Sequence, residues 1–205
     1  MTKKPTVFSL PFAMIAAEGH MAVGQQLYEA FENMVFRPRS DGEHVDMQEA
    51  FRLAAPAVLN MSLCLEILLK AHHFQTSGTY PRGHNVSELA GMLPEESLVK
   101  IRDEYMRIGD DRSIPDGVSF RFTFMEPDTL SEQRRRSEYD FSTFDAAVEY
   151  VGDMYKWFRY FYEDLTDRGS VFVSFEPIYR SAIAVHRVAR DYRGSTKVFI
   201  DLSKS

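Results

Sequence analysis

Two oppositely charged side chains stand one helical turn apart inside an otherwise apolar segment of this 205-residue chain. Residues 53–71 read LAAPAVLNMSLCLEILLKA, and the two charges are Glu66 and Lys70. A helix that is apolar on every side is a buried helix. Burying a charge costs several kcal/mol unless the charge is paired and hydrogen-bonded. The pair is therefore expected to be either a structural ion pair or part of a functional site.

Three further polar residues join this pair as candidates. Ser62 precedes Glu66 by four residues, so Ser62, Glu66 and Lys70 form one stripe on a helix. His84 lies at a predicted loop-to-helix junction, and histidine can change its charge near neutral pH. Arg159 lies among aromatic residues on a later predicted helix. These five side chains are the residues whose types and spacing could do chemistry.

Two accounts of this group remain open from the sequence. In the structural account, Glu66 pairs with Lys70 or Arg159, His84 fixes a loop, and the network only stabilises packing. In the functional account, Lys70 and Arg159 bind a phosphate or another anion, while His84 and Glu66 supply general acid and base. Lys70, His84 and Arg159 in one basic concavity would favour the second account, and a sealed ion pair would favour the first.

Metal, cofactor and thiol chemistry have little support in the sequence. His72 and His73 are adjacent, so they point apart on a helix, and no His-x-x-x-His or Cys-x-x-Cys spacing occurs. No glycine-rich phosphate loop is present. Cys64 is the one cysteine and lies in the apolar segment, where an inert buried thiol is expected. We expect no metal and no cofactor.

The overall charge limits the possible partners. With 24 Lys and Arg against 30 Asp and Glu, the net charge is −6, so contact with nucleic acid requires a local basic patch. A run of three arginines, Arg134 to Arg136, either belongs to a solvated loop or forms such a basic patch. The charge-free stretch 53–65 is shorter than the about 20 residues that span a bilayer. A cytoplasmic protein without membrane contact is expected.

Hydrophobic periodicity and turn residues predict a mainly helical chain. An irregular insertion near residues 110–141 contains an alternating, strand-like stretch at 118–124. The aromatic run at 157–162 is expected to fill the core and a homodimer interface. Pro56 is expected to kink the second helix or to mark its true start. The predicted helices cover about 12–36, 47–74, 85–92, 94–108, 143–165 and 177–192.

Three sequence blocks occur in a recognisable order: SLCLEILLKA at 62–71, RGHNVSEL at 82–89 with Leu93-Pro94 soon after, and WFRYFYE at 157–163. Together they resemble the HEPN-like helical proteins. The resemblance covers about residues 46–192. It implies a single all-α, up-and-down bundle, often dimeric, in a superfamily with many RNA-cleaving toxins, abortive-infection proteins and inactive members. It makes RNA or a nucleotide the expected partner and adds Arg82 to the ligand-binding candidates.

Catalytic members of that superfamily typically carry an Arg-x(4–6)-His pair. Arg39 with His44 and Arg180 with His186 satisfy this spacing. The first pair lies in a polar loop. The second lies in a predicted helix, where six steps place the two side chains about 240° apart on different faces. Both are therefore expected to be chance matches. The sequence favours a HEPN-like protein that interacts with RNA or a nucleotide. Its catalytic form would be a ribonuclease of a defence or toxin–antitoxin system. The alternative is a non-catalytic helical interaction module.

Overall fold

The structure is a computed structural model that describes residues 8–36, 45–109, 119–123, 141–168 and 170–192. These residues form six helices and two short strands, so the prediction of an all-α bundle with a β-containing insertion is confirmed. In chain order they are α1 (Leu10–Phe36), α2 (Met47–Ser77), α3 (Val86–Gly91), α4 (Glu95–Gly109), β1 (Ser119–Thr123), α5 (Phe144–Arg168), β2 (Ser170–Ser174) and α6 (Phe175–Asp191).

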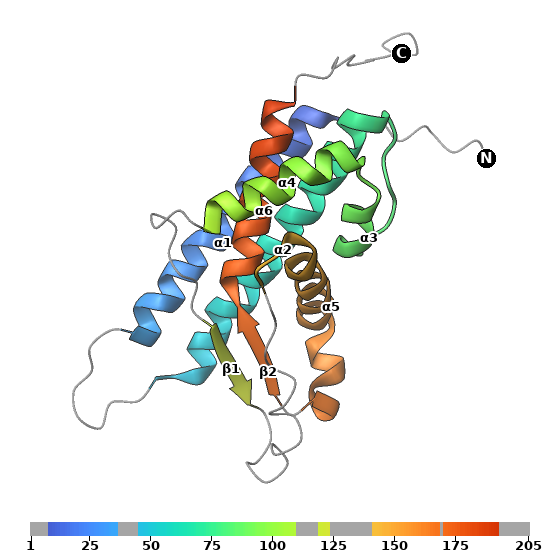
Figure 1. Cartoon of the computed structure of the whole chain (residues 1–205). Helices are drawn as coiled ribbons and strands as arrows, with labels where there is room; N and C mark the ends of the chain where they lie inside the picture. Colours follow the sequence, from blue (N-terminus) through green and yellow to red (C-terminus); the bar gives the residue numbers. More distant parts are fainter. Residues whose placement is uncertain (1–7, 37–44, 110–118, 124–140, 169, 193–205) are drawn as a thin grey trace, which may run out of the picture.

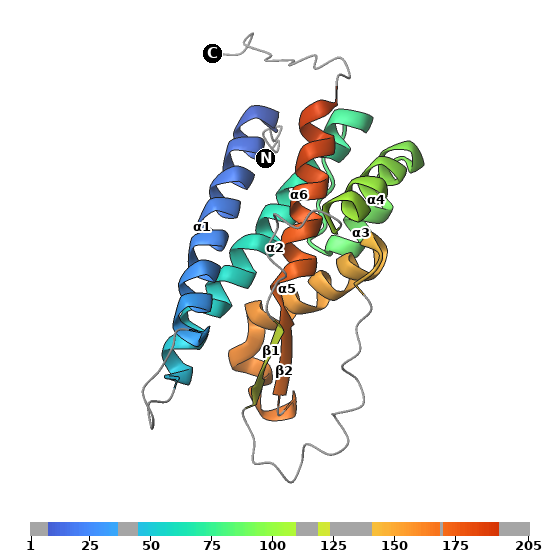
Figure 2. The ribbon, with the colours of Figure 1, turned by 60° about the vertical axis from the view of Figure 1, so that its left-hand side comes forward.

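Helix α2 is the centre of the bundle. It packs against α1, α6, α5 and the short α3, while α4 packs against α6 and α5. Figure 2 shows α1 along one edge of the molecule, with α2 and α6 beside it and with α3 and α4 on the opposite side. The two strands extend from one end of the bundle next to α5 (Figure 1). The central position of α2 explains why its sequence is apolar on every side.

Local chemistry fixes where α2 begins and ends. The side chain of Asp46 accepts hydrogen bonds from the backbone N–H groups of Gln48 and Glu49, which makes Asp46 the N-cap. Pro56 lies inside the helix, so the prediction that it marks the true start of the helix is wrong. Gly78 ends the helix at φ 72°, a left-handed conformation that glycine adopts without steric cost.

The predicted starts of α3 and α4 are confirmed. The Asn85 side chain accepts from the N–H groups of Ser87 and Glu88, and its own amide donates to the Glu88 carboxylate at 3.1 Å. The Pro94 carbonyl accepts the first backbone bonds of α4. Proline is suited to a helix start because it lacks the N–H that the first turn would leave unpaired.

The stretch at 118–124, expected to be a strand or an extended loop, is a strand at Ser119–Thr123, and its partner was missed. β1 pairs antiparallel with β2, with Ser119 opposite Ser174 and Thr123 opposite Ser170. Residues 166–176 carried no assignment from the sequence. Because β2 runs directly into α6, that helix begins two residues earlier than Pro177, where we expected it. The Tyr150 hydroxyl on α5 accepts a hydrogen bond from the Ser174 backbone N–H at 2.6 Å and fixes this junction.

The buried side chains of all six helices join in one hydrophobic core. Within the described residues, the segment Gln48–Ser77 is long and apolar enough to cross a membrane, but 67% of its most apolar window is buried inside the bundle. This burial is typical of the core helix of a soluble protein. Phe158 of the aromatic run is buried as expected. The side chains of the other aromatic residues at 157–162 lie outside the description.

Candidate functional site

The sequence-predicted group centres on one carboxylate oxygen. Glu66 Oε1 lies 2.8 Å from Lys70 Nζ and 2.8 Å from His84 Nδ1. A carboxylate only accepts hydrogen bonds, so both nitrogens donate to it and the His84 proton lies on Nδ1. The side chains of Glu66 and Lys70 are 4% and 5% exposed. The His84 side chain is 63% exposed, so this imidazole is the part of the group that faces solvent.

The loop between α2 and α3 closes over this ion pair. Lys70 Nζ lies 5.5 Å from the centre of the Tyr80 ring, within the range of a cation–π contact. His84, at the other end of the loop, binds Glu66. The two contacts hold the loop against the C-terminal half of α2, where the Lys70 side chain is buried.

Of the remaining predicted site residues, Ser62 and Arg82 have described side chains, and neither forms a hydrogen bond or ion pair with Glu66. Ser62 is fully buried, and its Oγ has no hydrogen-bond partner among the described residues. Arg82 lies in the same loop and is exposed. Arg159 lies on α5, but its side chain is outside the description. Arg134–Arg136 and the pair Arg39 and His44 also lie outside the described residues.

Only one of the two Glu66 carboxylate oxygens, Oε1, has hydrogen-bond partners among the described residues. Glu66 Oε2 is buried without a hydrogen-bond partner among the described residues, as is Ser62 Oγ. A buried carboxylate is stabilised by its cation partner, so the Lys70 ammonium has an electrostatic role in this conformation. An ammonium that is 5% exposed and bound to a carboxylate offers no free charge to a phosphate. The geometry favours the structural account.

The second Arg–His pair points to two different neighbours, as the helical geometry predicts. Arg180 Nε donates to the Tyr105 carbonyl of α4 at 2.6 Å, and its guanidinium carbon lies 3.9 Å from the centre of the Tyr105 ring. His186 Nε2 lies 3.0 Å from Glu18 Oε1 of α1. The two side chains therefore lie toward opposite partners of α6 and do not form a joint site.

A large groove lies between the end of α2, α4 and α6, with a volume of about 880 Å³. It contains three cations, but each is paired. Lys100 binds Glu96 at 2.7 Å, while Arg107 and Arg187 bind Glu104 at 2.6 and 2.8 Å. The Arg107 hydrogen bond, with Arg187 assisting, lowers the pKa of Glu104. Asp103 and Asp191 also line the groove, so its four carboxylates outnumber its three Lys and Arg side chains, and it is a poor site for RNA phosphates.

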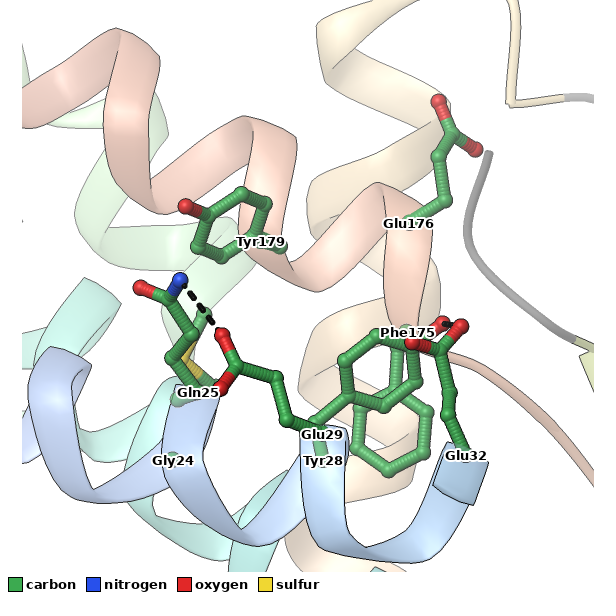
Figure 3. Close-up of a pocket in the computed structure, with 9 residues that line it drawn as sticks. Gly24, Gln25, Tyr28, Glu29, Glu32, Phe175, Glu176 and Tyr179 are labelled. Atoms are coloured by element: carbon green, nitrogen blue, oxygen red, sulfur yellow. Dashed lines mark hydrogen bonds between the residues drawn. The ribbon is translucent and has the colours of Figure 1, made fainter. Parts of the chain in front are cut away.

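A smaller pocket lies between α1 and α6, and sequence analysis missed it. Its walls combine aromatic rings with carboxylates (Figure 3). Its volume is about 50 Å³. The signal in the sequence was weak. Gln25 with Glu29 and Tyr28 with Glu32 have helical i, i+4 spacing, but nothing local indicates that Phe175 and Tyr179 join them. The lining residues are Gly24, Gln25, Tyr28, Glu29, Glu32, Met61, Phe175, Glu176 and Tyr179.

Thiol and metal chemistry have no site in the described part of the chain. Burial raises the pKa of Cys64 to about 12, so its thiol stays protonated at neutral pH and cannot act as a nucleophile. No group of three or more His, Cys, Asp or Glu side chains that could hold a metal ion occurs among the described residues.

Comparisons with known proteins give no relative. No family model matches the chain, and neither a curated protein nor a solved structure matches it.

Proposed function

We propose that this protein is a non-catalytic helical interaction module that forms a homodimer through the outer face of α1. The observation that carries the proposal is an exposed helix face without charge. Phe12 is 74% exposed, Ile15 62% and Val23 45%. The exposed residues of this face are spaced alternately four and three positions apart, and we call them the α1 seam. They are Phe12, Ala16, Gly19, Val23, Gln26, Ala30 and Asn33, and the exposed residues Ile15 and Ala22 lie beside them.

The seam lies opposite the face that α1 presents to the rest of the molecule. Ala17, Gly24 and Phe31 are buried and recur every seven residues. Each is followed two positions later by a seam residue, which lies about 200° round the helix. One side of α1 thus packs into the bundle, and the opposite side is apolar or uncharged yet faces solvent. Contiguous exposed apolar surface commonly marks an interaction site.

Gly19 is the most informative residue of the seam. A glycine in the middle of a helix costs about 0.5–1 kcal/mol relative to alanine. A Cβ atom at Gly19 would meet nothing within 4 Å, so no contact within the described chain requires a glycine there. A small residue on an exposed helix face permits the close approach of a second helix backbone. Gly24, by contrast, is required inside the chain, because a Cβ there would collide with Met61.

A second copy of this chain fits the seam better than a charged partner does. The seam contains no Asp, Glu, Lys or Arg over almost the whole of the 27-residue helix. A two-fold interface places the same patch on itself, so like charges would face each other if the patch were charged. The alternating spacing of four and three is that of helices that pack side by side at a shallow angle.

The Glu66 network supports the same non-catalytic proposal, because it ties down a loop and leaves the Lys70 ammonium buried. The HEPN-like assignment stays a separate proposal, supported by the three sequence blocks, which fall on α2, on the loop into α3 and on α5. An RNA- or nucleotide-binding role in a defence or toxin–antitoxin system would have to use exposed groups such as Arg82 and His84.

Sedimentation equilibrium of wild type and two matched variants tests the dimer. Val23 in the seam and Val99 on α4 are 45% and 46% exposed, so Val23→Glu and Val99→Glu place the same charge on equally exposed helix positions. Measurements from about 1 to 100 μM cover association free energies of about −8 to −5.5 kcal/mol. We expect dimers for wild type and Val99→Glu and monomers for Val23→Glu. A monomeric wild type over this range, or equal behaviour of the two variants, contradicts the proposal.

A further inference from the structure

The pocket between α1 and α6 has the chemistry of a site for an organic cation. Three aromatic rings line it, from Tyr28 on α1 and from Phe175 and Tyr179 on α6. The Tyr28 and Phe175 rings lie 4.4 Å apart between centres and are inclined by 46°. Figure 3 shows these rings close to the carboxylates of Glu29 and Glu32, while Glu176 points away. Aromatic faces attract cations through their quadrupole.

The two carboxylates are oriented by neutral donors. Gln25 Nε2 donates to Glu29 at 3.0 Å, and the Tyr28 hydroxyl donates to Glu32 at 2.6 Å. Within the described part of the chain, neither carboxylate has a cationic partner, whereas Glu176 pairs with Arg180 at 3.1 Å. Their hydrogen bonds position Glu29 and Glu32 without neutralising them. Among the described residues, two carboxylates without a cationic partner therefore lie at the edge of the aromatic pocket.

The field of Glu29 reaches into the pocket. Burial is the main cause that raises the pKa of Tyr179, the negative charge of Glu29 raises it further, and the positive charge of Arg187 lowers it by a smaller amount. The charge that disfavours a phenolate at this position also favours a bound cation.

Size and lining exclude a metal ion and favour an ammonium group. The volume of about 50 Å³ has room for about three or four water-sized groups, so only the head of a larger molecule enters. Hard metal ions need six or more oxygen ligands, and these aromatic walls do not supply them. Aromatic rings beside carboxylates are the arrangement that recognises alkylated ammonium groups.

We propose that the pocket formed by Tyr28, Phe175 and Tyr179, with Glu29 and Glu32 at its edge, binds an alkylammonium head group. The group is carried either by a free small amine or by a methylated lysine of a polypeptide. The proposal does not depend on the α1 dimer, because the rings and carboxylates all belong to one chain.

Titration followed by amide chemical shifts tests the site. The probes are tetramethylammonium chloride, the uncharged and similarly branched neopentyl alcohol, spermidine, and a short peptide with one trimethyllysine. We expect tetramethylammonium to shift the amides of residues 24–32 and 175–179 and to bind at least about tenfold more tightly than neopentyl alcohol, or about 1.4 kcal/mol. A preference for the peptide over tetramethylammonium identifies a polypeptide source, and equal or better binding of the free amines identifies a small molecule.

Charge-matched variants separate the pocket from general electrostatics. Glu29→Gln with Glu32→Gln removes both pocket charges, and Glu149→Gln with Asp153→Asn removes two exposed charges on α5. We expect only the first pair to weaken tetramethylammonium binding, by about tenfold.

The aromatic wall is tested separately at Tyr179, which is not fully buried. Tyr179→Phe keeps the ring and is expected to keep the binding, whereas Tyr179→Leu is expected to lose it. The melting temperature of each variant shows whether it is folded. Equal binding of the charged and uncharged probes, equal affinities for the two charge-loss pairs, or unchanged binding by Tyr179→Leu overturns the proposal.

Discussion

At the residue scale, one oxygen atom links two distant parts of the chain. Glu66 Oε1 accepts from Lys70, one turn further along α2, and from His84, 18 positions away. The partners differ in exposure, at 5% for Lys70 and 63% for His84, so they contribute differently to stability. A buried partner that loses its counter-charge is left uncompensated, whereas an exposed one is rehydrated.

This difference predicts the outcome of single and double substitutions. Glu66→Gln leaves the buried Lys70 ammonium unpaired and is expected to lower the free energy of unfolding by about 3–5 kcal/mol. Glu66→Gln with Lys70→Met removes both charges and is expected to recover most of that loss. His84→Ala is expected to cost about 1 kcal/mol or less, because the imidazole is exposed. Urea unfolding followed by circular dichroism measures all three. A Glu66→Gln variant as stable as wild type would refute the structural role of the pair.

At the element scale, the two faces of α1 carry different packing requirements. Gly24 lies where α1 meets α2, and a Cβ atom there would approach Met61 at 2.6 Å and the Ala57 carbonyl at 3.3 Å. Gly19 lies on the opposite face with open space around it. Gly24 thus allows α1 and α2 to pack closely, whereas a Cβ atom at Gly19 would touch nothing within the described chain, and Gly19 lies on the exposed face.

The same substitution at the two glycines should therefore have opposite effects on the folded monomer. Gly24→Ala forces Met61 and the helix to shift and is expected to destabilise the protein by about 1–3 kcal/mol. Gly19→Ala improves helix propensity without a clash and is expected to stabilise it by about 0.5–1 kcal/mol. Thermal unfolding at low protein concentration keeps association out of the comparison. A similar loss of stability in both variants would contradict the assignment of Gly24 to the buried face of α1 and of Gly19 to its exposed face.

At the scale of the whole molecule, the charge distribution bears on the RNA hypothesis. The chain carries a net charge of −6, and the three cations of the large groove are each bound to a carboxylate. Helix α6 also holds Arg180 toward α4 and His186 toward α1. A ribonuclease needs these groups, or equivalent ones, around a single phosphate.

We accordingly expect wild type neither to cleave single-stranded RNA or total tRNA nor to bind them with a strong salt dependence. Wild type is compared with His84→Ala, Arg159→Ala and His186→Ala, after unfolding curves have shown that the variants are folded. Cleavage lost in His186→Ala alone would establish an Arg–His site despite the separation of the two side chains. Cleavage lost in His84→Ala or Arg159→Ala would place catalysis beside α2. Either result would replace the interaction-module proposal with the HEPN-like ribonuclease.

The sequence by itself determined the elements whose signals are local. Helical periodicity located all six helices, and Asn85 and Pro94 act at the starts of α3 and α4 for stereochemical reasons that do not depend on the rest of the chain. The alternation at 118–124 located β1. The apolar surroundings of Glu66 and Lys70 predicted a buried helix whose two charges form either a structural ion pair or part of a site, and the helix is buried with the two charges paired.

Only the tertiary structure decided which distant residues meet. β2 reads SVFVS, which is compatible with a strand, but it is only five residues long and its partner β1 lies about 50 positions earlier in the chain. A short local pattern does not show which distant segment it pairs with. The pocket joins Tyr28 to Phe175 and Tyr179, and the seam becomes visible only once the buried face of α1 is known. Periodicity shows that a helix has an apolar or small-residue face. Which neighbour covers that face, and which face remains open, depends on the packing of the whole bundle.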